Sequence, residues 1–151
     1  MKKIISIILL SVFLYADNVT LEFGFDTNNP KSDNYYKGIG FTFLEDDTNQ
    51  IKLEYGNYVN QYDDNANMVM VTNIYTPLSY QLARLGVVGS FGYQKGYYVN
   101  DLAQPNATKG DDSSLFVSYG LYVELDNIYV EFVCLPNDKR VLKGGIKAVE
   151  W

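Results

Sequence analysis

The stretch Ser114–Cys134 reads SLFVSYGLYVELDNIYVEFVC and alternates apolar with polar or small residues on both sides of Asp126-Asn127. Alternation with a period of two is the pattern of β-strands, whose successive side chains point to opposite faces. A two-residue turn fixes the register of a hairpin, so we expect Leu125 to lie opposite Ile128. One face is then wholly apolar and the other mixes acids, tyrosines and small residues. The apolar face holds Val117, Tyr119, Leu121, Val123, Leu125, Ile128, Val130, Phe132 and Cys134, and the polar face holds Ser118, Gly120, Tyr122, Glu124, Tyr129 and Glu131.

The same alternation continues outward from this hairpin and predicts eight strands, separated by segments rich in Gly, Asn, Asp and Pro. The predicted strands are 18–26, 35–45, 50–60, 67–77, 82–96, 114–125, 128–134 and 141–151. Long and short connecting segments alternate along the chain. An even strand number with this loop pattern is typical of outer-membrane barrels. The sequence therefore predicts an all-β fold, an eight-stranded antiparallel up-and-down transmembrane β-barrel with short periplasmic turns and longer external loops.

Composition excludes several classes of function. The 151 residues include 18 acidic and 12 basic side chains, no His and one Cys. Without His, a Ser-His-Asp or Cys-His nucleophile and a His-ligated zinc site are impossible, and one Cys forms neither an internal disulfide nor a zinc cluster. An acidic chain also lacks the basic clusters that bind nucleic acid. We expect no cofactor, no metal and no nucleic-acid partner.

The N-terminus has the parts of a secretory signal peptide. Lys2 and Lys3 precede an apolar run, Ile4–Leu14, and a small residue, Ala16, follows it. The run is too short to cross about 30 Å of hydrocarbon as a helix, so any membrane insertion must use strands. We expect a signal peptide over residues 1–16, cleaved after Ala16, a barrel domain over 17–151, and export to the outer membrane of a Gram-negative bacterium.

Period two alone does not say whether the apolar face points outward into lipid or inward. The inward alternative is a soluble periplasmic lipocalin-like barrel that binds a hydrophobic ligand. The polar face favours lipid, because its charges are nearly balanced and its glycines suit a crowded interior. Strand 67–77 does not distinguish its faces, since Met68–Val71 are all apolar. We expect the polar face to form an ion-pair network inside the barrel, made of Glu22, Lys52, Glu54, Arg84, Glu124, Glu131, Lys143 and Lys147.

The chain after residue 16 resembles the small eight-stranded outer-membrane β-barrel proteins of the adhesin and serum-resistance type. The resemblance lies in the architecture and in the aromatic last residue, Trp151. It implies that Trp151 is a signal for the barrel-assembly machinery. If Trp151 faces lipid, strict alternation turns Lys143 and Lys147 outward as well, so we expect a β-bulge near Gly144-Gly145 to restore the register.

A fainter similarity is to the outer-membrane lipid A deacylases, whose catalytic strand carries a His-x-Ser-Asn motif. The comparable stretch here is Cys134-Leu135-Pro136-Asn137, in which only Asn137 matches. Cys replaces the base and Pro replaces the nucleophile, so the family's triad chemistry cannot operate. The alternatives that this similarity leaves open are a lipid A-modifying barrel enzyme or an inactive relative of one.

An eight-stranded barrel is filled by side chains and makes no general diffusion pore, so we place the function in the external loops. The longest, 97–113, carries Tyr97, Tyr98, Leu102 and Pro105, which we expect to contact a partner. The expected product is a monomeric, non-catalytic protein for surface interaction, adhesion or envelope structure. Its expected partners are outer-membrane lipid or lipopolysaccharide, the barrel-assembly machinery, and an extracellular ligand or a phage.

Overall fold

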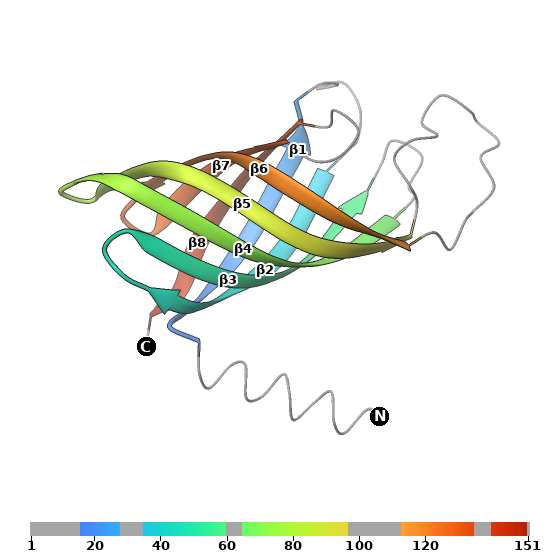
Figure 1. Cartoon of the computed structure of the whole chain (residues 1–151), viewed down its shortest axis with the longest axis horizontal. Helices are drawn as coiled ribbons and strands as arrows, with labels where there is room; N and C mark the ends of the chain where they lie inside the picture. Colours follow the sequence, from blue (N-terminus) through green and yellow to red (C-terminus); the bar gives the residue numbers. More distant parts are fainter. Residues whose placement is uncertain (1–15, 28–34, 60–64, 97–112, 135–139, 151) are drawn as a thin grey trace.

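Eight strands close into a single antiparallel barrel in a computed structural model of the chain (Figure 1). The structure describes residues 16–27, 35–59, 65–96, 113–134 and 140–150. Each strand pairs with its neighbours in the chain, and the last pairs with the first, which confirms the predicted eight-stranded antiparallel up-and-down β-barrel. The strands are β1 (Asn18–Asp26), β2 (Tyr35–Glu45), β3 (Asn49–Val59), β4 (Asn65–Tyr80), β5 (Ala83–Gly96), β6 (Ser113–Leu125), β7 (Ile128–Cys134) and β8 (Arg140–Glu150).

The two ends of the barrel differ. Three tight connections lie at one end, which we call the turn end: Asp46–Thr48, Gln81-Leu82 and Asp126-Asn127. Asn18 pairs with Glu150, so β1 begins and β8 ends at the turn end as well. The opposite end is called the loop end. Among the described residues, no helix is long and apolar enough to cross a membrane.

Strand β4 runs past its predicted end at residue 77, through Pro77 to Tyr80. Two features of the pairing explain how a proline fits there. The register with β5 shifts between Tyr75 and Leu78, so Pro77 lies in a bulge. The last backbone hydrogen bond from β4 toward β3 is donated by Thr76 to the Thr48 carbonyl. Pro77 lies beyond it, so its missing N–H removes no hydrogen bond between the two strands.

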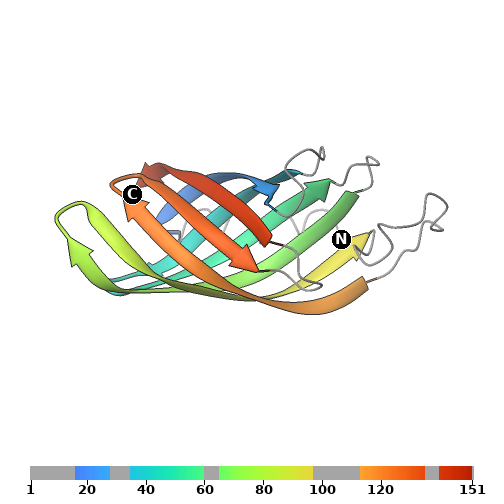
Figure 2. The ribbon, with the colours of Figure 1, turned by 90° about the horizontal axis from the view of Figure 1, so that it is seen from above.

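The strands are strongly staggered, and their tilt is visible in Figure 2. A path through paired residues, taken once around the barrel, returns to β6 ten residues nearer the loop end. The path runs through Leu125, Ile128, Ile146, Leu21, Ile39, Tyr55, Val69, Tyr93 and Leu115. Ten residues rise about 33 Å and eight strands span about 38 Å of circumference, which gives a tilt of about 40° from the barrel axis.

The two faces of the wall have opposite character. Apolar side chains point outward: Phe23, Leu115, Val117 and Tyr119 are each between 64% and 68% exposed. Polar and charged side chains of the same strands, Glu22, Glu54 and Glu131 among them, are completely buried inside. The face assignment made from the Ser114–Cys134 hairpin is therefore confirmed, with its apolar face outward.

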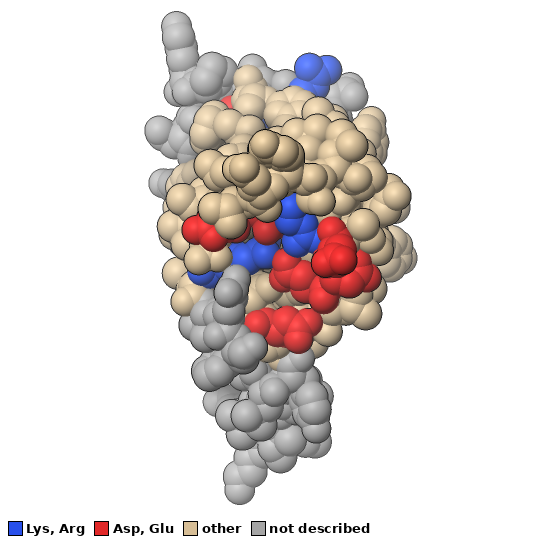
Figure 3. Space-filling model, turned by 90° about the vertical axis from the view of Figure 1, so that its left-hand side faces the viewer, with Lys and Arg blue, Asp and Glu red and all other residues tan. Residues whose placement is uncertain are grey.

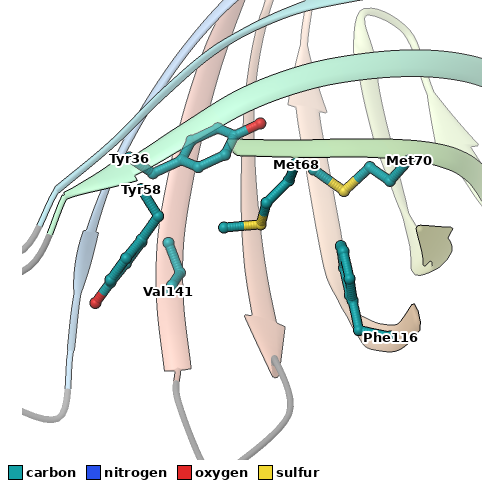
Figure 4. Close-up of a cluster of buried hydrophobic side chains, with 6 residues drawn as sticks. All are labelled: Tyr36, Tyr58, Met68, Met70, Phe116 and Val141. Atoms are coloured by element: carbon teal, nitrogen blue, oxygen red, sulfur yellow. The ribbon is translucent and has the colours of Figure 1, made fainter. Parts of the chain in front are cut away.

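The structure also settles the faces of β4, which the sequence left open. Met68, Met70 and Ile74 point inward and are at most 5% exposed, whereas Val69 and Val71 are about half exposed outside. The methionines join Tyr36, Tyr58, Phe116 and Val141 in an apolar cluster inside the barrel (Figure 4). One part of the interior is thus packed by apolar side chains and another part by charged ones.

The prediction of a β-bulge in β8 is wrong in its position. There is no bulge at Gly144-Gly145: the two residues pair with Val130 and Tyr129 in unbroken register. Lys143 and Lys147 are buried, whereas Ile146 is 56% exposed, so simple alternation already directs the lysines inward. The irregularity lies nearer the end of the strand, at Ala148, because Val19 pairs with Val149 and Thr20 pairs with Lys147.

Gly145 is required on the inner face for a different reason. A Cβ at this position would overlap the ring of Tyr129. Because the phenol of Tyr129 is one of the largest buried side chains, the glycine makes the room that this ring occupies.

Candidate functional site

Two ion-pair clusters lie inside the barrel. The first, the central cluster, consists of Glu22, Lys52, Glu54, Glu131 and Lys143, contributed by β1, β3, β7 and β8. Lys52 Nζ lies 3.3 Å from a Glu22 oxygen and 3.0 Å from oxygens of Glu54 and Glu131. Lys143 Nζ lies 3.4 Å from the other Glu22 oxygen and 2.9 Å from the other oxygens of Glu54 and Glu131. Each of the three carboxylates therefore bridges both ammonium groups.

Tyrosines complete the central cluster. Glu22 accepts hydrogen bonds from the hydroxyl groups of Tyr129 and Tyr36, the latter at 3.2 Å. Lys52 Nζ also lies 4.5 Å from the centroid of the Tyr129 ring, a cation–π distance. Because the side chains of the cluster are at most 7% exposed, these contacts replace the water that the charges lose on burial.

The second group, the mouth cluster, lies at the turn end and consists of Glu45, Arg84, Glu124 and Lys147. Lys147 Nζ lies 2.8 Å from Glu45 and 3.1 Å from Glu124, and Arg84 Nη1 lies 2.8 Å from Glu45 and 3.7 Å from Glu124. Two of its side chains are more exposed than those of the central cluster, Arg84 at 15% and Glu45 at 23%, whereas Lys147 and Glu124 are as buried as the central residues. Figure 3 shows basic and acidic side chains gathered at this end of the barrel.

The mouth cluster is held to the turn between β2 and β3. Arg84 Nη2 donates a hydrogen bond to the backbone carbonyl of Asp46 at 2.8 Å. The carboxylate of Asp46 in turn accepts the backbone N–H groups of Thr48 and Asn49, both at 2.8 Å. These bonds, first that from Thr48 and then that from Asn49, hold the pKa of Asp46 below its usual value of 3.8.

The structure brings all eight residues of the expected lumen network into these two clusters. It adds Glu45, which strict alternation places on the outer face with Phe41. A register shift between Thr42 and Leu44 turns Leu44 outward and Glu45 inward. Asp46 and Asp47 follow immediately and look like a turn, so the sequence offers little signal for the ion-pairing role of Glu45.

Between the charged and the apolar parts of the interior lies a cavity of about 20 Å³. Its lining includes Met68, Met70, Ser118 and Lys143. The hydroxyl of Ser118 is buried and has no hydrogen-bond partner. A cavity of this size holds about one water molecule, which would satisfy that hydroxyl.

Several predicted functional residues lie outside the described part of the chain. They are the contact residues Tyr97, Tyr98, Leu102 and Pro105 of the longest loop, and the terminal Trp151. Residues 1–15 of the predicted signal peptide are outside it too, whereas Ala16 packs with Val19 and Phe41. Of the stretch compared with the deacylase motif, only Cys134 is described, and it ends β7, paired with Arg140.

The chain matches no protein-family model and no curated protein, so the arrangement of its own side chains carries the functional argument.

Proposed function

We propose that this chain is a non-catalytic, monomeric outer-membrane β-barrel protein that acts through its external loops, in surface interaction, adhesion or envelope structure. The observation that carries the proposal is the inverted polarity of the wall. Fully buried ion pairs occupy the centre of the barrel, while leucines, valines and aromatics cover its outside. Soluble monomers rarely expose continuous apolar patches beyond a few hundred Å², and here such residues surround the barrel.

The height of the apolar surface supports the same proposal. The path of paired residues around the barrel starts at Leu125 near the turn end and returns to the same strand at Leu115. At a tilt of about 40° these two residues are separated by about 25 Å along the barrel axis. The apolar band of outer-membrane barrels is also about 25 Å tall.

The alternative of a soluble lipocalin-like barrel requires an apolar interior that receives a ligand. The centre of this barrel instead holds Lys52, with a 1% exposed side chain, against three carboxylates. A hydrophobic ligand there would have to separate these ions in a medium of low dielectric constant, which is strongly unfavourable.

The test of the membrane proposal is expression of the full chain in a Gram-negative host, followed by fractionation. We expect the protein in the outer-membrane fraction, extracted only by detergent, with a gel mobility that changes on boiling. Release by osmotic shock without detergent would overturn the proposal, since the outward apolar residues would then face water or another protein.

The role of the loops needs a separate experiment. Deletion of residues 100–111 is expected to leave barrel assembly, and the mobility change on boiling, intact. It is also expected to abolish binding to a surface, ligand or phage that the full chain supports. An unchanged binding phenotype in a correctly assembled deletion variant would remove the longest loop from the proposal.

A further inference from the structure

Two methionines, Met68 and Met70, carry their thioether groups on the inner face of β4. One residue separates them and successive strand residues point to opposite faces, so both side chains enter the barrel from the same wall. Figure 4 shows them next to each other, and both line the cavity of about 20 Å³. Their backbones are about 6.6 Å apart. Because a methionine side chain is unbranched and flexible and metal–sulfur bonds are about 2.3 Å long, both sulfurs can contact one ion in the cavity.

Two serines line the same cavity, and one of them has an unused hydroxyl. The hydroxyl of Ser90 is hydrogen-bonded to that of Thr72 at 2.8 Å, whereas the hydroxyl of Ser118 has no hydrogen-bond partner among the described residues. Ser118 is 1% exposed, so bulk water does not solvate its oxygen. A hydroxyl oxygen carries lone pairs and can act as a weak third ligand to a cation beside the two sulfurs.

The central cluster beside the cavity selects the charge of the ion. Lys143 lines the cavity and belongs to this cluster. Its ammonium group lies within 3.4 Å of oxygens of Glu22, Glu54 and Glu131, which gives one carboxylate for each of its protons. Three carboxylates against two lysines leave the cluster with one net negative charge in a medium of low dielectric constant. A monovalent cation in the cavity would balance that charge, whereas a divalent cation would exceed it.

The ligand atoms select the kind of metal. Thioether sulfur is a soft ligand that suits Cu(I), whereas hard cations such as Mg²⁺ and Ca²⁺ take oxygen ligands. Zinc takes Cys, His or carboxylate ligands, and among the described residues no group of three or more His, Cys, Asp or Glu side chains is arranged to hold a metal ion. The absence of His and of a second Cys excludes these ligand sets, but it does not exclude a pair of thioethers.

We propose that the cavity beside Met68, Met70 and Ser118 binds one Cu(I) ion, held by the two thioether sulfurs and balanced by the net negative charge of the central cluster. A water molecule in the same cavity would satisfy Ser118, but it would use neither sulfur and would leave the charge uncompensated. The site requires only the closed barrel, so this inference does not depend on the proposed membrane location. It gives the barrel interior a metal-binding role beside the role proposed for the loops.

The test uses the full chain with Cys134→Ser, refolded in detergent, with carbon-13 in the methyl groups of its methionines. Cys134 is replaced because its thiol, on the outer face of β7, would bind the same metals. Ag(I) is the probe, since it is soft and monovalent like Cu(I) and is stable in air. We expect one Ag(I) per chain to shift the methyl signals of Met68 and Met70, and Cu(I) added without oxygen to shift the same two signals. Equimolar Na⁺ or Zn²⁺ should shift neither, and the signal of Met1, which is not part of the site, should not move.

Substitutions in the same background separate sulfur, charge and packing. Met68→Leu and Met70→Leu conserve side-chain volume and remove one sulfur each. Each should lose at least about 10–100-fold in affinity for Ag(I), the range that loss of an outer-shell partner alone causes. Glu54→Gln removes the net negative charge and leaves both sulfurs, and it should weaken binding by about fivefold or more. Ile74→Leu is the matched control: it exchanges a buried apolar residue on the inner face of the same strand and should leave the affinity unchanged.

Several results would overturn the proposal. A shift of one methionine alone, or an equal shift of Met1, would indicate adventitious binding to single thioethers. An unchanged affinity in the Met→Leu variants or in Glu54→Gln would remove the sulfurs or the charge from the site, and an equal loss in Ile74→Leu would show that packing controls the affinity. The mobility change on boiling verifies that each variant is folded. Fractionation of the full chain is a separate measurement, so a failure of the membrane proposal leaves the outcome of the Ag(I) titration unchanged.

Discussion

The central cluster and the mouth cluster are built from the same residue types in different surroundings. In the central cluster three carboxylates share two lysines, and every side chain is at most 7% exposed. In the mouth cluster two carboxylates share Arg84 and Lys147, and the side-chain exposure reaches 23%. Ion pairs near water contribute little to stability, whereas breaking a buried one leaves a charge that nothing solvates. Ion pairs with similar N–O distances in the two clusters should therefore contribute unequally to the free energy of unfolding. This difference predicts an order of mutational effects.

The largest effect is expected for Lys52→Met. The substitution leaves three carboxylates around Lys143 alone, and removal of one partner from a buried ion pair costs about 3–5 kcal/mol. Urea unfolding of the refolded barrel in detergent, followed by gel mobility, measures the loss. A cost below that of a mouth-cluster substitution would contradict the comparison between the two clusters.

A smaller loss is expected for Glu54→Gln. Three carboxylates against two lysines give the central cluster one excess negative charge, and this variant removes it, whereas Lys52→Met adds to the excess. Some cost remains, because the amide places a donor beside a lysine and a hydrogen bond to a charged group contributes about 1.5–3 kcal/mol. The same unfolding assay should place Glu54→Gln well above Lys52→Met in stability. The reverse order would mean that charge balance does not govern this cluster.

The mouth cluster should tolerate substitution. In Arg84→Gln, Glu45 keeps Lys147 at 2.8 Å, and Glu124 keeps hydrogen bonds from Gln50 and Tyr122. We expect a loss of about 1 kcal/mol or less, decreasing further in high salt because the exposed charges are screened. Unfolding curves at low and high salt check this, with Lys52→Met as the matched variant whose loss should not depend on salt. A loss at the mouth that is insensitive to salt would argue that this cluster is as dry as the central one.

The smallest effect concerns pH at the turn beside the mouth cluster. The pKa of Asp46 is lowered by the N–H groups of Thr48 and Asn49, so its contribution to stability is present above its usual pKa of 3.8. That contribution is lost as the pH falls through the lowered value. Asp46→Asn keeps an acceptor for the same N–H groups but does not titrate. The stability difference between wild type and Asp46→Asn should therefore shrink on acidification below pH 3.8, and a constant difference would show that the carboxylate charge is irrelevant.

The sequence predicted the strand order and both faces of most strands, because a half-buried wall requires a strict period of two. Its errors coincide with local breaks in that period. The register shift between Thr42 and Leu44 conceals the inward position of Glu45, and the bulge at Pro77 conceals the last residues of β4. The irregularity at Ala148 replaces the one expected at Gly144-Gly145. A bulge inserts one residue without a compositional signature, so only the partner strand reveals it. The faces of Met68 and Met70 needed the closed barrel for a different reason, because Met68–Val71 are all apolar and no polar residue marks either face there.

The pairing of β1 with β8 has a consequence for the order of events in assembly. Asn18 pairs with Glu150, so one edge of β1, the first strand after the predicted cleavage point, has no partner until β8, the last strand, is present. Until β8 is in place, every partial sheet has two open edges that invite association with other chains. Contacts so distant in sequence form slowly, because the chain loses the entropy of closing a loop of nearly its whole length before these contacts stabilise it. A chain of this topology gains its stability in one late closing step, and a helper that shields both edges until then would act on the slowest event of its folding.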